Sequence, residues 1–392
     1  MLAVVAGAFA IVIFGGDVNA SAAKAKKGGY QWTLPANLPE PRVPANNPMT
    51  QPKVTLGRFL FYDARLSGNG KQSCSSCHLQ KKAFTDGLPR AIGSTGELHP
   101  RSSQTLTNVA YHGVLTWANP GLTRLEKQME VPLFGDNPVE MGLNDRNKAK
   151  VLARFRRVKQ YRVMFKRAFP NQAQPIGYGN IIRAIASFQR TLISGNSKYD
   201  RWLRGAATMT ASEQRGMSLF FGERAECHHC HGNFNFTDQV VYKGGPTPEI
   251  SFHNTGLFNI GGTGAFPEPN RGVFELTGRP DDMGKFRAPT LRNIAVTKPY
   301  MHDGSLPTLR SVVDFYAAGG RVIADGPLAG DGRASPLRSD LTVGIDLSEQ
   351  EKTDLVMFLK TLTDRSFLRA KALSDPFAAQ RARARRAAAA KR

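Results

Sequence analysis

Two five-residue stretches carry the residue types whose spacing points most directly to chemistry. They are Cys74-Ser75-Ser76-Cys77-His78 and Cys227-His228-His229-Cys230-His231, and together they hold all 4 cysteines of the chain. Two cysteines three positions apart, followed at once by histidine, form the attachment sequence of a c-type haem. Each thiol adds to one vinyl group of the porphyrin, and the adjoining histidine becomes the proximal iron ligand. The stretches therefore predict two covalently bound haem c groups, with His78 and His231 as iron ligands.

Zinc binding and thiol–disulfide exchange are the competing interpretations of paired cysteines. Zinc ribbons need no histidine directly after each pair, and the two pairs lie too far apart in sequence to suggest one shared site. A thioredoxin-like dithiol is expected among alternating strands and helices, and no such pattern surrounds either motif. The haem interpretation is favoured, although two haems alone would also suit a non-catalytic electron carrier.

The elements that must position these motifs are predicted to be mainly helical. Thr210 can cap a helix together with Glu213, three residues later, just before an apolar helical run. Strand-like alternation is nearly absent. The predicted fold class is mainly α, with two tandem cytochrome c-like domains, one haem in each, and long ordered loops. Further helices are expected over residues 54–62, 124–129, 148–169, 181–193, 309–318 and 347–359.

The chain divides into four predicted segments. Residues 24–205 form an N-terminal cytochrome c-like domain, residues 206–365 a C-terminal one, and residues 366–392 a basic Ala/Arg-rich tail. Residues 1–23 contain an apolar run that is short for a bilayer span and is followed by small residues, which is typical of a secretory signal peptide or a retained anchor. Since c-type haem is attached outside the energy-transducing membrane, we expect a periplasmic protein.

The formal net charge of +22 is the most unusual bulk property of this 392-residue chain. Such an excess favours an acidic protein partner or an anionic surface. A nucleic-acid partner is disfavoured, because no helix-turn-helix, finger or aromatic-basic pattern is present.

Several stretches around the motifs resemble a known family. LEKQMEVPLFGDNPVEMG lies between the two motifs, and FRAPTLRNIAVTKPYMHDGS follows the second one. Both resemble the di-haem cytochrome c peroxidase/MauG family, and the resemblance covers roughly residues 45–365. GSTGELHPRSS, LTWANPGL and FHNTGLFNIGG are most similar to the MbnH group of methanobactin operons. That resemblance implies an enzyme that uses hydrogen peroxide to reach a two-electron-oxidised (bis-ferryl) di-haem state and oxidises a tryptophan of a partner protein, MbnP, to kynurenine.

The resemblance implies three catalytic residues. Glu140 and Gln128 match the family's distal pair at the peroxide-reacting first haem, where a carboxylate can move the peroxide proton and an amide can orient the peroxide. Taken alone, Gln128 would be interpreted as a solvated helix residue and Glu140 as part of a turn. Trp117 matches the family's indole between the haems and is expected to carry electrons between them, or simply to pack against porphyrin.

The second haem is expected to be six-coordinate, and its distal ligand separates the subfamilies. Fourteen residues after His302, where peroxidases carry methionine, this chain has Tyr316, and MauG uses a tyrosinate there. A hard anionic oxygen stabilises high oxidation states of iron, whereas a thioether favours the ferrous state. Tyr316 is the preferred ligand, and Met301 is the alternative.

Weaker candidates complete the predicted sites. The family holds a calcium ion between its domains, and Thr297, Pro299 and Ser102 match its ligand positions, with Ser102 replacing an asparagine; hard cations accept such oxygens. His99 and His112 could close the first haem. His228 and His229 are expected to be exposed.

Three functional hypotheses follow. The preferred one is a MauG/MbnH-like enzyme that oxidises an MbnP-like, copper-binding partner protein. The second is a di-haem cytochrome c peroxidase that reduces hydrogen peroxide with electrons from a small cytochrome or cupredoxin. The third is a non-catalytic di-haem electron carrier.

Overall fold

The structure is a computed structural model, and it describes residues 30–382. The predicted signal peptide or anchor and the last ten residues of the tail lie outside this range. Within it the chain is mainly helical, as predicted, and its sheet consists of β1 (Val322–Ile323) paired antiparallel with β2 (Gly330–Asp331). Among the described residues, no helix combines the length and apolar character needed to cross a membrane.

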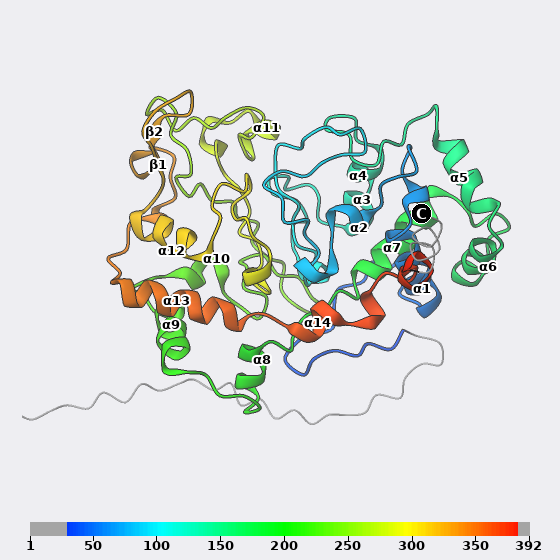
Figure 1. Cartoon of the computed structure of the whole chain (residues 1–392), viewed down its shortest axis with the longest axis horizontal. Coiled ribbons are helices and arrows are strands. Elements are labelled where there is room, and N and C mark those ends of the chain that lie inside the picture. The colour runs from blue at the N-terminus through cyan, green and yellow to red at the C-terminus, as the bar shows by residue number, and fades with distance from the viewer. Residues whose placement is uncertain (1–29, 383–392) are drawn as a thin grey trace, which may run out of the picture.

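Two groups of helices surround the two cysteine motifs (Figure 1). The first group consists of α1 (Gln51–Phe61), α2 (Cys74–Cys77), α3 (Leu125–Gln128), α4 (Glu130–Phe134), α5 (Lys148–Arg156), α6 (Lys159–Ala168) and α7 (Tyr178–Gln189). The second consists of α8 (Lys198–Leu203), α9 (Ala211–Phe221), α10 (Cys227–His231), α11 (Phe274–Thr277), α12 (Leu309–Ala318) and α13 (Glu349–Thr361). A last helix, α14 (Arg365–Arg369), returns to the first group.

Each group is built around one close crossing of two helices. In the first, α1 crosses α7 at Gly57, where a Cβ atom would lie 1.9 Å from the carbonyl oxygen of Ala184. In the second, α9 crosses α13 at Gly216, where a Cβ atom would lie 1.9 Å from the carbonyl oxygen of Asp354. Only glycine permits such a backbone approach. Because a helix crossing at a glycine occurs in both halves, the two units share one architecture, as the sequence predicts.

Local signals account for several helix ends. The predicted capping box is confirmed, since the Thr210 side chain accepts from the backbone N–H of Glu213 and Glu213 reaches back to Thr210. The predicted single helix over residues 148–169 is wrong, because the chain becomes extended at Val158 and forms two helices. The break lets Phe155 of α5 and Tyr161 of α6 face the same core, with ring centroids 4.9 Å apart. A continuous helix would place these two residues roughly 120° apart around its axis.

The C-terminal segment packs against the first unit. Phe367 and Leu373 are buried in the hydrophobic core that also contains α1 and α7. Tyr62, at the end of α1, donates its hydroxyl hydrogen to the carbonyl oxygen of Leu373 at 2.7 Å. Residues 366–374 therefore contribute to the first unit, and the boundaries of the domains remain a prediction.

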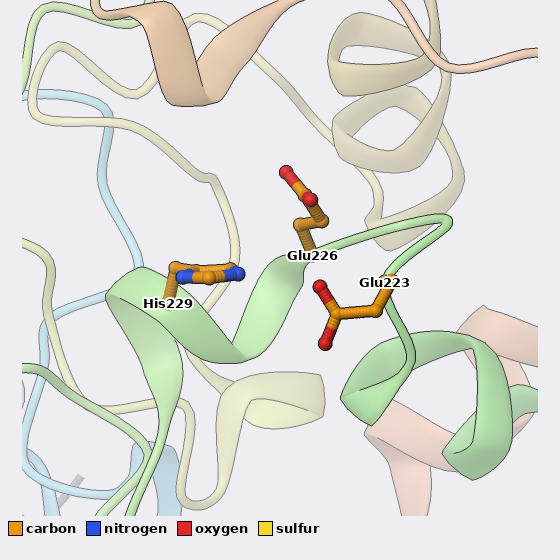
Figure 2. Close-up of side chains that lie close together, drawn as sticks. All are labelled: Glu223, Glu226 and His229. Atoms are coloured by element: carbon orange, nitrogen blue, oxygen red, sulfur yellow. The ribbon is translucent and has the colours of Figure 1, made fainter.

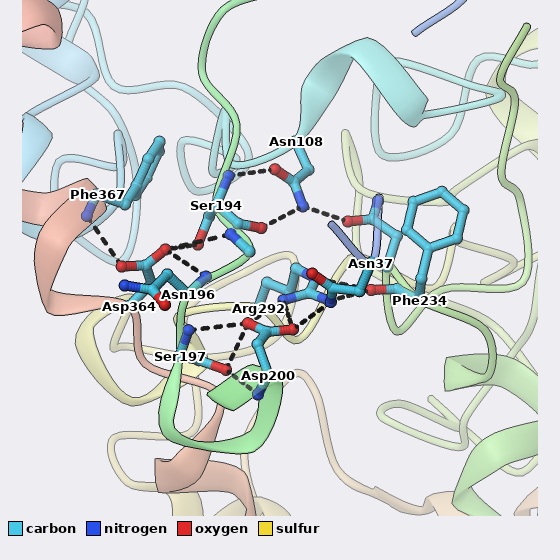
Figure 3. Close-up of polar contacts among 12 residues, drawn as sticks. Asn37, Asn108, Ser194, Asn196, Ser197, Asp200, Phe234, Arg292, Asp364 and Phe367 are labelled. Carbon is cyan, nitrogen blue, oxygen red and sulfur yellow. Dashed lines mark hydrogen bonds and ion pairs between the residues drawn. The ribbon is translucent and has the colours of Figure 1, made fainter. Parts of the chain in front are cut away.

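A buried polar network joins the two units (Figure 3). Within the second unit, the Arg292 guanidinium lies 2.9 Å from the Asp200 carboxylate, and both side chains are fully buried. Asn108 of the first unit donates to Asn235 of the second at 3.0 Å. The Asp364 carboxylate accepts from the backbone N–H of Asn196 at 3.0 Å. Such contacts fix how the units face each other, and so how their two cysteine motifs are placed.

Candidate di-haem site

The first cysteine motif lies on α2, and its histidine follows the helix directly. The Nδ1–H of His78 donates to the carbonyl oxygen of Phe84 at 2.7 Å. Phe84 has a left-handed backbone conformation, with φ of 63°. Because Nδ1 is used in this bond, Nε2 remains available to bind a metal, which is the usual arrangement of a metal-binding histidine.

The second motif, on α10, repeats this arrangement. The Nδ1–H of His231 donates to the carbonyl oxygen of Phe236 at 3.2 Å, and Phe236 is also left-handed, with φ of 53°. Phe84 and Phe236 each begin a Phe-Thr-Asp triplet that follows its motif. This repeated triplet is a sequence signal that could have identified the carbonyl partners of both histidines.

The thiols of the motifs are unpaired and largely desolvated. Burial raises the pKa of Cys74, Cys77 and Cys227 to about 12. Within residues 30–382, no cysteine belongs to a group of three or more side chains with the spacing of metal ligands.

A cavity of about 210 Å³ opens beside the second motif. Its walls are mostly apolar and include Cys227, Cys230 and His231. Trp117, Met301 and Tyr316 line the same cavity, so both predicted candidates for the distal ligand lie on it. An apolar cavity bordered by two thiols and a histidine with a free Nε2 fits a haem attached through thioethers.

Tyr316 reaches this cavity from α12. Burial raises the pKa of its hydroxyl, and negative charge on Cys230 and Cys227 would raise it further. A tyrosinate at this position therefore requires a strong local cation, such as ferric iron. Met301 borders the cavity from a loop, in a left-handed conformation with φ of 69°.

Two buried polar residues on the cavity wall were not predicted as site residues. Within the described chain, His302 Nε2 and Arg287 Nε are buried and have no hydrogen-bond partner. The His302 ring stacks on Phe286 with centroids 3.6 Å apart, and burial lowers the pKa of His302 well below its usual value. Arg287 donates to the carbonyl oxygen of Val114 at 3.0 Å, and burial lowers its pKa to about 10. Unsatisfied donors on a cavity wall suit the propionate and other polar groups of a bound haem.

A third group missed by the sequence analysis lies beside the second motif. His253 Nε2 is 2.7 Å from the Asp238 carboxylate, and His253 also borders the cavity. Burial alone would lower the pKa of His253, but hydrogen bonds to Asp238 and Cys230 outweigh it and raise the pKa to about 10. Asp238 is the last residue of the second Phe-Thr-Asp triplet, so the repeated triplet could also have identified Asp238 as a site residue.

Glu140 lies close to the first motif. Its negative charge raises the pKa of both Cys74 and Cys77, and burial raises the pKa of Glu140 itself to about 7. Part of the side chain remains accessible, although surrounding atoms desolvate the carboxyl. A carboxyl group with a pKa near neutrality can both accept and return a proton.

Gln128 is half-buried at the end of α3. The backbone N–H of Met141 donates to the carbonyl oxygen of Pro132 at 2.9 Å. This bond holds residue 140 beside α4, which directly follows Gln128 in the chain. The two predicted distal residues therefore come from adjoining segments of the first unit.

Trp117 lies between two cavities. It lines the cavity of the second motif and a smaller one, of about 70 Å³, between the units. Its Nε1–H donates to the carbonyl oxygen of Ser102 at 3.0 Å. The smaller cavity also contains all three predicted calcium positions, Ser102, Thr297 and Pro299, on its wall.

The remaining histidines occupy other environments. His99 and His112 are both buried, and His112 Nδ1 lies 3.2 Å from an Arg287 nitrogen. His229 is exposed as expected, but His228 is half-buried. Figure 2 shows His229 beside Glu223 and Glu226, with candidate ligand atoms within 4.8 Å of one another. We assign no metal to this cluster, since exposed groups commonly gather in this way without an ion.

The fold and the two motif-bearing sites define a di-haem protein of the cytochrome c class. Residues 51–208 match the di-haem cytochrome c peroxidase family. Cytochrome-c peroxidase IdrP1 of Denitromonas iodatirespirans is 37% identical over 88% of this chain and 90% of its own length. Methylamine utilization protein MauG of Methylorubrum extorquens is 32% identical over 92% of each chain. The chain therefore belongs to the di-haem cytochrome c peroxidase family, to which MauG also belongs, and is a di-haem oxidoreductase.

Solved structures agree with this assignment. A MauG-like protein associated with microbial copper homeostasis is 57% identical, covers 89% of this chain and all of its own, and superposes with a TM-score of 0.88. The di-haem peroxidase BthA of Burkholderia thailandensis, at 21% identity, covers 84% of this chain and 90% of its own, with a TM-score of 0.63, and supports the fold alone. Two haem cofactors and hydrogen peroxide as oxidant follow from the family.

Proposed function

We propose that this protein uses hydrogen peroxide to oxidise a tryptophan of a separate, MbnP-like protein to kynurenine. The observation that carries the proposal is Tyr316 on the wall of the cavity that contains His231. An anionic oxygen ligand would favour storage of oxidising equivalents over acceptance of electrons from a carrier. The 57% identity to a MauG-like protein associated with copper homeostasis also supports a copper-linked partner.

The cofactors in this proposal are two haem c groups. One would be held by thioethers from Cys74 and Cys77 with His78 as ligand, and the other by Cys227, Cys230 and His231. When bound, the haems supply the reduction of peroxide and hold its oxidising equivalents. Calcium at Ser102, Thr297 and Pro299 is a further element of the proposal, as is a periplasmic location.

The residues of the chain have separate tasks. Glu140 accepts the proton of incoming peroxide and returns it to the leaving oxygen, and Gln128 orients the peroxide through its amide. Trp117 would pass an electron between the two units, and Tyr316 would supply an oxygen ligand to the iron of the haem held by His231. The partner protein is then oxidised from the surface near the second unit, without entering a pocket.

The proposal is tested by incubating the haem-loaded protein with peroxide and the partner and analysing the partner by peptide mass spectrometry. Conversion of one tryptophan to kynurenine is expected. Peroxide turnover that depends on a reduced small cytochrome or cupredoxin, with the partner unchanged, would favour the peroxidase alternative. That alternative is kept because a cytochrome-c peroxidase is 37% identical and Met301 borders the same cavity.

A further inference from the structure

A dense group of positive charges lies on α5, α6 and the turns beside them. Residues 145–167 contain ten Lys or Arg and one acidic residue, which accounts for +9 of the total +22. Most of these side chains are exposed. We call the exposed Lys and Arg side chains of residues 146–167 the basic patch. Nothing in the proposed peroxide chemistry uses it.

The charges of the patch are not neutralised within the protein. Lys148 pairs with Asp145 at 3.0 Å, and the other nine basic residues of this segment form no ion pair within residues 30–382. Arg154 has a structural task, since it donates to the carbonyl oxygens of Ser67 and Gly68 at 2.7 and 2.9 Å and so fixes α5. The remainder repel one another and produce a local positive potential, which attracts anions.

The patch is displayed on one side of α6. Tyr161, Phe165 and Ala168 bury the opposite side in the core. Lys159, Arg162 and Lys166 are exposed, and their spacing of three and four residues places them along one face. The packing of α6 therefore holds the charges in a fixed array directed away from the core.

The position of the patch separates it from the second site. In Figure 1, α6 lies at one end of the long axis, and α12, which carries Tyr316, lies toward the other. The chain leaves the described region near the same end as α6: Arg381 donates to the carbonyl oxygen of Tyr62, at the end of α1, at 2.8 Å, and α1 packs on α6. The sequence beyond it, residues 383–392, contains five Lys or Arg and no acid.

The composition of the patch favours a lipid surface over a protein. Protein interfaces are centred on buried aromatic or aliphatic anchors. In residues 145–167 of the structure, Val163 is the one large apolar side chain that is well exposed, at 41%. Anionic bilayers need no such anchor, because each Lys or Arg near the surface contributes independently. We propose that the basic patch binds an anionic phospholipid surface and leaves the second unit directed away from the membrane.

The test is co-sedimentation of the haem-loaded full chain with vesicles of phosphatidylcholine plus phosphatidylglycerol, and with vesicles of phosphatidylcholine alone. We expect binding to the anionic vesicles only, and weaker binding at high salt. The triple variant Lys159→Gln/Arg162→Gln/Lys166→Gln should reduce the partition coefficient by about fivefold per charge, or on the order of 100-fold in all. Far-UV circular dichroism verifies that the variant is folded.

The matched control is Arg201→Gln/Lys360→Gln/Arg365→Gln, which removes the same charge from exposed positions on α8, α13 and α14. It should bind vesicles nearly as well as the unmodified chain. Equal losses in both variants would show that net charge alone drives binding and would overturn the assignment to the patch. Absence of binding to the anionic vesicles would overturn the lipid assignment.

Discussion

The backbone N–H of Arg287 donates to the carbonyl oxygen of Trp117 at 2.8 Å, and both residues line both cavities. The bond joins the backbone of Trp117 to the segment that carries Arg287, and both side chains lie on the walls of the two cavities. An indole held in place at the junction of the units suits the task of passing electrons that we propose for Trp117.

Replacement of Trp117 by phenylalanine should slow partner oxidation by about tenfold or more, since a tenfold loss corresponds to ~1.4 kcal/mol of activation free energy. Phenylalanine fills much of the space but is far harder to oxidise. Stopped-flow measurement of tryptophan loss in the partner gives the rate. Trp202→Phe, a change on α8 away from both cavities, is the control and should have no effect. Equal rates for both variants would refute the relay.

Replacement of Glu140 by glutamine should lower the rate of peroxide consumption by about 10²–10⁴-fold, because the proton acceptor is lost. The double variant Glu140→Gln/Gln128→Glu moves the carboxyl group from position 140 to position 128. If this variant does not regain the rate of peroxide consumption, the carboxyl group must be at position 140. Undiminished peroxide consumption by Glu140→Gln would contradict the assignment.

The pH dependence gives a second test of Glu140. Its pKa is raised by burial to about 7, so the carboxylate form becomes dominant as the pH rises through 7. The rate of peroxide consumption should therefore increase with pH around 7 in the unmodified protein. The Glu140→Gln variant should show no such increase. The free energy of unfolding has the opposite trend. The raised pKa makes the folded state bind the proton more tightly, and this contribution is lost as the pH rises from about 4.5 to about 7.

Replacement of Tyr316 by methionine should raise the reduction potential of the second haem by on the order of 10² mV, because a thioether favours the ferrous state. Spectroelectrochemistry measures the change. Met301→Leu should leave the potential and optical spectrum of that haem nearly unchanged. The reverse result, with sensitivity at Met301 and none at Tyr316, would assign the distal ligand to Met301.

Replacement of Asp200 by asparagine should destabilise the second unit, where Asp200 lies on α8. Arg292 would remain fully buried without its carboxylate, at a cost of about 3–5 kcal/mol. Thermal unfolding followed by circular dichroism should show a clear decrease in Tm. Asp331→Asn removes the carboxylate of an exposed pair with Arg333 and should produce no measurable change.

The sequence predicts features that depend on neighbouring residues. The cysteine motifs, the capping box at Thr210 and the helix over residues 309–318 all depend on spacings of a few positions, and the structure confirms the cap and the helix. The break at Val158 was not predictable in this way, because it serves the shared burial of Phe155 and Tyr161.

The missed site residues depend on contacts between distant segments. Arg287 meets Trp117 across 170 positions of the sequence, and Phe367 enters a core formed mainly by residues 56–192. Neither contact produces a periodic pattern in the neighbouring sequence that would reveal it. The roles of Gln128, Glu140, Trp117 and Tyr316 came from the family resemblance, and they remain predictions that the variants above can test.

The most direct test of the central claim is to add one equivalent of hydrogen peroxide to the fully ferric protein without a reductant, and then to add the partner. We expect rapid loss of the ferric spectrum, followed by its recovery as one partner tryptophan is oxidised by two electrons and gains one oxygen atom. A second equivalent of peroxide should complete the four-electron oxidation to kynurenine, with the lost carbon released as formate, and mass spectrometry detects both stages. If the ferric protein does not react until one haem has been reduced, and the partner remains unmodified, the protein is a peroxidase supplied by an electron carrier and the proposed function is wrong.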